Sequence, residues 1–107
     1  MQVRLIFVPA GGGEADYQLA FDLPAIPEPG DYISIRRPDQ DGTEDFIVRR
    51  TLWELHYPGT EGVNDPAIGG PKAIFVECEF AIGPYSSKDH RAAAQGYGAK
   101  RFEETAF

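Results

Sequence analysis

The sequence has few of the residues that crosslink small proteins or bind metals: one cysteine, Cys78, and two histidines, His56 and His90. A single cysteine excludes an internal disulfide framework and any zinc site built from several thiolates. The histidines fall in different predicted elements, and neither has a second ligand at the short spacings of known metal motifs. We therefore predict no metal site and no cofactor.

Long hydrophobic runs and excess positive charge are also missing. The apolar run after Met1 is too short for a secretory signal, and no other run is long enough to span a membrane, so we expect a cytoplasmic protein without a membrane partner. Seventeen acidic residues against ten basic ones give a net charge of −7. This balance disfavours nucleic acid as a partner, because such binding needs uncompensated positive charge. A local basic face is still compatible with it.

What is present is a series of strand patterns between turn-forming residues. β-Branched and aromatic residues, or strict alternation of apolar and polar residues, predict strands. The five segments are residues 3–8, 17–23, 32–37, 45–57 and 73–82. The glycine run at 11–13 and the Asp-Gly pair at 41–42 predict hairpin turns. The fourth segment changes its apolar parity near Arg49-Arg50-Thr51, which predicts a β-bulge there.

The pattern changes after Gly83-Pro84. Ser86 or Ser87 can cap a helix that runs to about residue 95, and residues 97–107 follow as a second short helix or a loose tail. We therefore expect one mainly β domain over residues 1–107. It would be a small antiparallel five-stranded barrel, SH3-like or OB-like, in residues 1–83, with a C-terminal helical appendage in residues 84–107.

The most pronounced candidate for binding is a pair of arginine dipeptides. Arg36-Arg37 and Arg49-Arg50 flank one predicted hairpin, so the two pairs could face each other across its strands. One side chain of each pair should then point to solvent. With Trp53 and Tyr57 nearby, these arginines could form a face for single-stranded nucleic acid. We favour the simpler interpretation that they pair with acids of the same hairpin loop, Asp39, Asp41, Glu44 and Asp45.

Other possible sites are weaker. The Asp-x-Asp-Gly segment from Asp39 lacks the glycine position, the twelfth-position Glu and the flanking helices of an EF-hand. Cys78 alternates with apolar residues, which predicts a buried, unreactive thiol. A Ser-His-Asp set could be written from Ser86 or Ser87, His90 and Asp89, but these residues are more simply helix caps.

The proline-rich segment 23–35, which contains Gly30-Asp31 before a strand, is followed by Phe46-Ile47-Val48-Arg49-Arg50. Together they resemble a pattern in small uncharacterised bacterial β-barrel proteins, where a Gly-Asp strand start leads into a hairpin. The resemblance covers about a third of the chain and implies the fold only.

Three functions follow as hypotheses. The first is a non-enzymatic binding or adaptor module for a protein partner or for a homo-oligomer, working through the 58–71 loop or the 97–107 tail. The second is a nucleic-acid accessory protein that uses Arg36, Arg37, Arg49 and Arg50. The third is a small enzyme with His56 or His90 beside a carboxylate. The first is favoured, because the sequence contains no catalytic motif.

Overall fold

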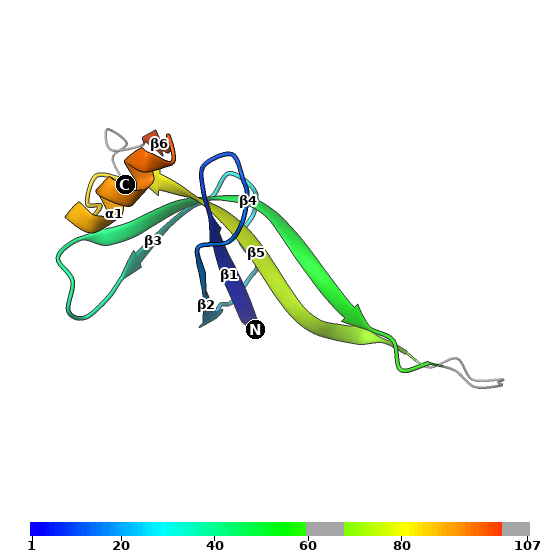
Figure 1. Cartoon of the computed structure of the whole chain (residues 1–107). Helices are drawn as coiled ribbons and strands as arrows, with labels where there is room; N and C mark the ends of the chain where they lie inside the picture. The colour runs from blue at the N-terminus through cyan, green and yellow to red at the C-terminus, as the bar shows by residue number, and fades with distance from the viewer. Residues whose placement is uncertain (60–67, 102–107) are drawn as a thin grey trace.

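A computed structural model describes residues 1–59 and 68–101 of the chain. Over these residues the protein is mainly β: one sheet curls into a half-barrel and carries one helix towards the C-terminal end (Figure 1). The described strands and helix are β1 (Gln2–Val8), β2 (Tyr17–Asp22), β3 (Tyr32–Arg36), β4 (Thr43–His56), β5 (Gly70–Ile82), α1 (Lys88–Gly96) and β6 (Lys100–Arg101). The expected β class with a C-terminal helix is confirmed.

The sheet has the order β2-β1-β5-β4-β3, with β6 paired to β5 beside this path. Three pairings are antiparallel hairpin neighbours, as the turn residues predict, and the β1–β2 turn passes through Gly11, Gly12 and Gly13, all with positive φ. β1 and β5 pair in parallel, so the sheet is not antiparallel throughout, contrary to our expectation. β1 and β5 are far apart in the sequence, and local residue patterns do not specify which distant strands become neighbours.

The hydrophobic core lies on the inner face of the curled sheet, which is the face that carries Phe46, Val76 and Phe80. Phe7 of β1 stacks on Phe46 of β4 with their ring centroids 4.1 Å apart. Cys78 lies fully buried in the same row of β5, as its alternation with apolar residues predicts. Helix α1 covers one end of this core, where Ala94 is buried.

The C-terminal segment is partly different from our expectation. Ser87 caps α1 by accepting a hydrogen bond from the His90 backbone N–H at 3.1 Å, which confirms one of the two predicted caps. Residues Lys100–Arg101, expected in a second helix or a loose tail, form β6 and pair in parallel with Ala81 and Ile82. Tyr97 packs edge-on against Phe80, with 5.0 Å between the ring centroids. Residues 102–107 lie outside the described residues.

The molecule is elongated because two strands outgrow their neighbours. β4 and β5 have 14 and 13 residues, whereas β1 has seven and β3 has five. The radius of gyration is 17.3 Å, compared with about 13 Å for a compact chain of this length. Figure 1 shows β4 and β5 continuing as a two-stranded ribbon well beyond the rest of the sheet. No helix among the described residues is long and apolar enough to cross a membrane.

Candidate functional site: the two-stranded arm

The ribbon formed by residues 50–59 and 68–74 is hereafter called the arm. β1 pairs with β5 from Phe75 onward, and β3 and the chain before it pair with β4 only as far as Val48. Beyond these points each arm strand has the other as its only neighbour among the described residues. The arm contains most of the predicted strand 45–57 and the described ends of the predicted 58–71 loop; residues 60–67 lie outside the described residues.

A bulge marks the point where the arm begins. The β4–β5 register shifts between Val48, opposite Cys78, and Arg50, opposite Glu77, so Arg49 is the extra residue. This confirms the predicted bulge. Because opposite residues of paired strands share a face, Thr51 and Trp53 lie on the same face as their partners Val76 and Ile74, which is the inner face. The apolar inner face therefore continues from the core onto the arm.

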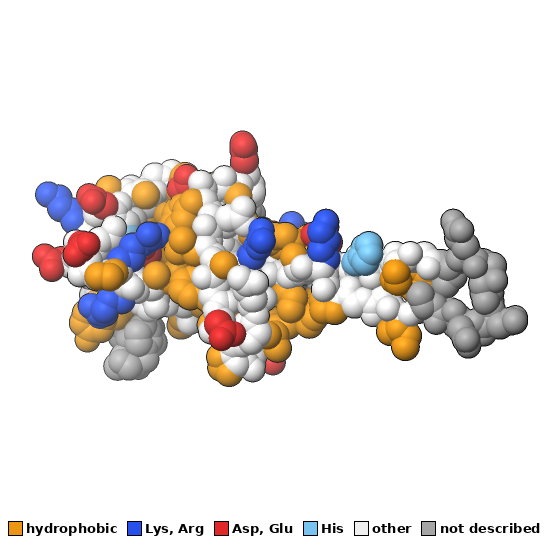
Figure 2. All heavy atoms as spheres, turned by 90° about the horizontal axis from the view of Figure 1, so that it is seen from below, with side chains coloured by type: hydrophobic (Ala, Val, Ile, Leu, Met, Phe, Trp, Pro, Cys, Tyr) orange, Lys and Arg blue, Asp and Glu red, His pale blue; other side chains and the backbone are white. Residues whose placement is uncertain are grey.

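No other described part of the chain covers the apolar side chains of the arm. Large apolar side chains of the arm are exposed to 50–92% of their full area, whereas the core residues of the same strands are buried. The exposed residues are Leu52, Trp53, Leu55, Tyr57 and Ile68. In Figure 2 orange hydrophobic side chains run along the arm, and blue cationic side chains lie near its base. Of the predicted site residues, Trp53 and Tyr57 thus belong to one apolar surface.

A depression of about 410 Å³ adjoins the base of the arm on the outer face of the sheet. Ile6, Leu52 and Phe75 supply apolar walls, and Arg50 and Glu77 supply polar ones. Leu52 lies opposite Phe75 and is therefore on this outer face, whereas Trp53 is on the inner face.

The bulge also brings both arginines of the second dipeptide onto one carboxylate. Arg49 Nε lies 3.2 Å from one oxygen of Glu77, and Arg50 Nε lies 2.7 Å from the other. In a regular strand, neighbouring side chains point to opposite faces; the extra residue of the bulge removes that alternation here. This corrects the expectation that one of these two arginines would point away from the other. It also shows that their partners lie on β5 and not in the hairpin loop.

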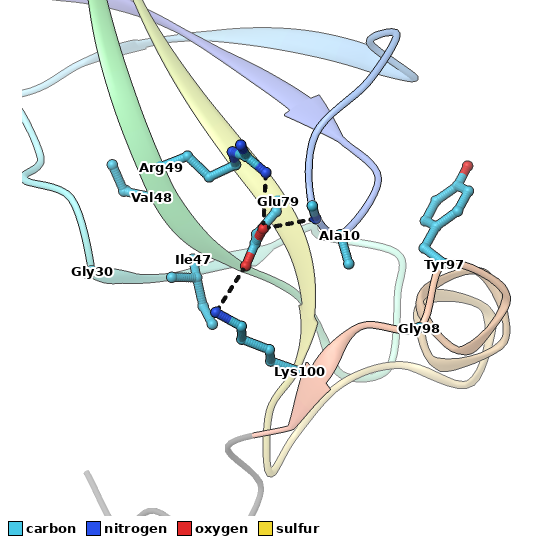
Figure 3. A pocket seen from close by; sticks show the side chains of 10 residues that line it. Ala10, Gly30, Ile47, Val48, Arg49, Glu79, Tyr97, Gly98 and Lys100 are labelled. Atoms are coloured by element: carbon cyan, nitrogen blue, oxygen red, sulfur yellow. Dashed lines mark hydrogen bonds and ion pairs between the residues drawn. The ribbon is translucent and has the colours of Figure 1, made fainter.

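Glu79 sits next to this pair in a shallow depression of about 760 Å³, shown in Figure 3. Its buried carboxylate accepts a hydrogen bond from the Gly11 backbone N–H at 3.0 Å and lies 3.4 Å from Arg49 Nη1 and 3.7 Å from Lys100 Nζ. Three donors from the β1–β2 turn, β4 and β6 thus surround one carboxylate. Because Glu79 contacts groups from the turn, β4 and β6 at once, we interpret this cluster as one that holds β6 and the turn against the sheet.

The first arginine dipeptide is separate from the second. Arg37 pairs with Glu44, its Nε 2.5 Å from a carboxylate oxygen, and this hydrogen bond raises the pKa of the guanidinium. The same carboxylate accepts from the Tyr17 hydroxyl at 2.7 Å. Burial and that bond raise the pKa of Tyr17. Arg37–Glu44 is the within-hairpin pair that we expected, whereas Arg36 is exposed and lies opposite Thr43. The two dipeptides do not face each other, because Arg49 lies beyond the paired part of β3.

The candidate catalytic groups occupy structural positions. His90 is buried, and its Nε2 lies 2.9 Å from the carbonyl oxygens of Asp45 and Ala81, so its ring contacts backbone groups within the described part of the chain. Ser86 bonds the buried Asp45 carboxylate, which also accepts from Ser34 and Thr43, the latter at 2.8 Å. Ser87 caps the helix, and Asp89 is exposed. The Ser-His-Asp set written from the sequence is therefore not assembled.

The remaining polar candidates are dispersed. His56 ends β4 on the exposed arm, whereas His90 lies in the core, so the two histidines belong to opposite parts of the molecule. Within residues 1–59 and 68–101, no group of three His, Cys, Asp or Glu side chains is placed to hold a metal ion. Burial raises the pKa of the Cys78 thiol to about 12, and the nearby Glu77 charge adds to the effect.

Sequence reasoning recognised Trp53 and Tyr57 but missed Leu52, Leu55 and Ile68 as exposed apolar residues of the arm. A usable signal was present in the strand lengths. The predicted segment 45–57 is about twice as long as the segment 32–37 before it, so part of it had to extend past that strand. Comparison of the chain with protein-family models, with curated proteins and with solved structures finds no match.

Proposed function

We propose that the protein is a non-enzymatic binding module that engages a protein partner through its arm. The observation that carries the proposal is the set of five large apolar side chains exposed on a ribbon that leaves the core. An isolated two-stranded hairpin is only marginally stable in water, and exposed apolar patches of this kind mark interaction surfaces. A partner that covers the arm would stabilise both the ribbon and the complex.

The size of the surface supports this function. Taking about 200 Å² for a fully exposed large side chain, the five residues present on the order of 600 Å². A stable protein interface of standard size buries about 800 Å² on each partner. Neighbouring backbone and the depression beside Leu52 can supply the difference. Trp53 and Tyr57 are of the residue types most enriched in interface hot spots.

Nucleic-acid binding through the arginines has weaker support. Among the described contacts, Arg37, Arg49 and Arg50 each have a carboxylate partner, and Arg36 is the one of the four arginines that does not. Affinity for nucleic acid comes from charges that are not compensated within the protein. Fluorescence polarisation with labelled oligonucleotides at low salt tests this alternative directly. The enzyme alternative lacks a carboxylate beside the ring nitrogens of His90 among its described contacts.

A reducing compartment, the cytoplasm, is the proposed location. The lone cysteine is buried in the core, and the described residues contain no disulfide. Buried free thiols are compatible with such an environment.

The binding function is tested by chemical crosslinking and affinity capture from cells with three versions of the chain. The wild type is compared with a Trp53→Ser, Leu55→Ser double variant and with Tyr85→Ser, which removes an equally exposed aromatic from the body. We expect the wild type and Tyr85→Ser to retain the same crosslinked species, and the arm variant to lose it. Identical crosslinks in all three versions would refute a binding role for the arm.

A further inference from the structure

We propose that the arm pairs with the arm of a second copy of this chain, strand β4 against strand β4, to form a two-fold symmetric dimer. The inference deepens the proposed function and rests on it, since it names the partner. Three observations carry it: an open strand edge, the direction of its peptide groups and its charge pattern.

The open edge belongs to β4 from Arg50 to His56. One side of these residues pairs with β5 between Gly70 and Glu77, and the other side has no strand neighbour among the described residues. Exposed edges of this kind present unpaired N–H and C=O groups and readily accept another strand. Figure 1 shows this part of β4 clear of β3, β1 and α1.

The register shows which peptide groups face outward. The Val48 N–H and C=O bond to Asp31 and Gly30 on the side away from β5, so Val48 and Cys78 form a pair without mutual backbone hydrogen bonds. Val76 is two residues from Cys78 along β5, so its N–H and C=O point in the same direction as those of Cys78, away from β4. Val76 lies opposite Thr51. The peptide groups of Thr51 and of Trp53 therefore face the open edge and can bond a new strand.

The sequence of this edge is self-complementary about Trp53, the midpoint of Arg50–His56. Antiparallel pairing about that point places Trp53 against Trp53 of the second copy and Thr51 against Leu55 of the second copy. Arg50 and Glu54 then become diagonal neighbours across the two strands, with opposite charges. Cross-strand aromatic pairs and opposite charges both stabilise antiparallel pairing. Arg50 has a side chain that is 75% exposed even while it contacts Glu77, so it can reach this neighbour.

The charge of the arm also fits a second copy. The described residues of the arm carry two cations, Arg50 and Lys72, and one anion, Glu54, although the chain as a whole is at −7. Two arms therefore meet without the repulsion that two acidic bodies would produce. Three of the exposed apolar side chains of the arm, Leu52, Trp53 and Leu55, lie within the paired segment and would contact the second copy.

The test is sedimentation equilibrium over a protein concentration series, using the whole chain and three variants. Trp53→Ser removes the central side chain. Thr51→Pro removes one outward N–H, a change that an edge strand tolerates because that N–H does not bond β5. Tyr85→Ser is the matched control on the body. Circular dichroism and urea unfolding establish that each variant is folded, and either arm variant suffices if the other fails to fold.

We expect the wild type and Tyr85→Ser to reach the mass of two chains, and Trp53→Ser and Thr51→Pro to stay at the mass of one. A dimer that persists in both folded arm variants would place the interface elsewhere and overturn the inference. A wild type that stays monomeric at every concentration would also overturn it. With a monomeric wild type, the crosslinking experiment decides the proposed function separately. If the arm variant loses the crosslinked species of the wild type, the proposed function stands; if it keeps that species, the proposed function fails as well.

Discussion

Asp45 shows how a buried charge in this fold is compensated by neutral groups. Its carboxylate is almost completely buried and accepts hydrogen bonds from the hydroxyls of Ser34, Thr43 and Ser86. These residues come from β3, the start of β4 and the loop before α1. Asp45 therefore ties the helix-bearing end of the chain to the sheet, next to His90, which bonds the backbone at the same place.

Replacing Asp45 by alanine should reduce the free energy of unfolding by about 3 kcal/mol. The change leaves the buried hydroxyls of Thr43 and Ser86, and the more exposed hydroxyl of Ser34, without their common acceptor, and it opens a small cavity. Urea unfolding monitored by circular dichroism measures the effect. Asp41→Ala, at an exposed position of the neighbouring loop, should change stability by less than about 0.5 kcal/mol. Equal stability of the two variants would show that the Asp45 cluster contributes nothing.

Cys78 makes stability depend on pH in the alkaline range. Burial raises the pKa of its thiol from 9.0 to about 12 in the folded protein. Below about pH 9 the thiol is protonated in both states and contributes no pH dependence. As the pH rises between these two values, the unfolded chain releases the proton and the folded chain keeps it. Stability therefore falls, by at most about 1.4 kcal/mol per pH unit from this group.

Cys78→Ala removes this contribution, so its unfolding free energy should fall less steeply than that of the wild type between about pH 8 and pH 10.5. Urea unfolding at a series of pH values measures both slopes. Tyr17, whose pKa burial also raises, is present in both proteins and cancels in the comparison. Equal slopes, or rapid reaction of the native wild type with a thiol reagent, would contradict the buried position of Cys78.

At the scale of elements, the β3–β4 turn is fixed by contact with the loop before α1. Gly42 has φ of +91°, and a Cβ there would lie 2.7 Å from the Tyr85 carbonyl oxygen and 2.9 Å from Ser87 Cα. The Thr43 N–H also donates to that carbonyl at 2.8 Å. This turn therefore needs glycine for two reasons, its conformation and the close approach of a second backbone.

Gly30→Ala separates the two reasons, because Gly30 has φ of +94° but nothing within 4 Å of an added Cβ. Gly30→Ala should cost about 1–2 kcal/mol from backbone strain alone. Gly42→Ala should cost at least about 2 kcal/mol more, because the turn must also move away from the loop. Thermal and urea unfolding of both variants measure the difference. Similar losses in the two proteins would mean that the contact with the α1 loop is unimportant.

The elements themselves were largely predictable from local patterns. Alternation along residues 74–82 located β5, the parity change near Arg49 located the bulge, and Ser87 was one of the two predicted caps. The parallel β1–β5 pairing was not predictable, because local alternation does not encode which strands become neighbours. The partners Glu77 and Glu79 of the arginines depended on the same unknown register. The burial of Asp45 was missed because its hydroxyl partners are distant in sequence.

At the scale of the whole molecule, the excess length of β4 and β5 produces both the elongated shape and the exposed surface. The long extent of the molecule is 58 Å, against 26 and 24 Å across it. The body buries its apolar side chains in the half-barrel, while the arm presents the same inner face to solvent. An arm that is exposed in the free chain and covered in the bound one is the central claim.

Trp53 tests this claim directly because it is the only tryptophan in the chain and lies on the arm. Its fluorescence therefore reports on the arm alone, and acrylamide quenching measures its access to solvent. In dilute solution we predict the red-shifted, readily quenched emission of an exposed indole. As the protein concentration rises, that emission should shift to the blue and lose its quenching when the arms pair. Blue-shifted, poorly quenched emission already in the dilute monomer would contradict the account, since the arm would then be covered by its own chain.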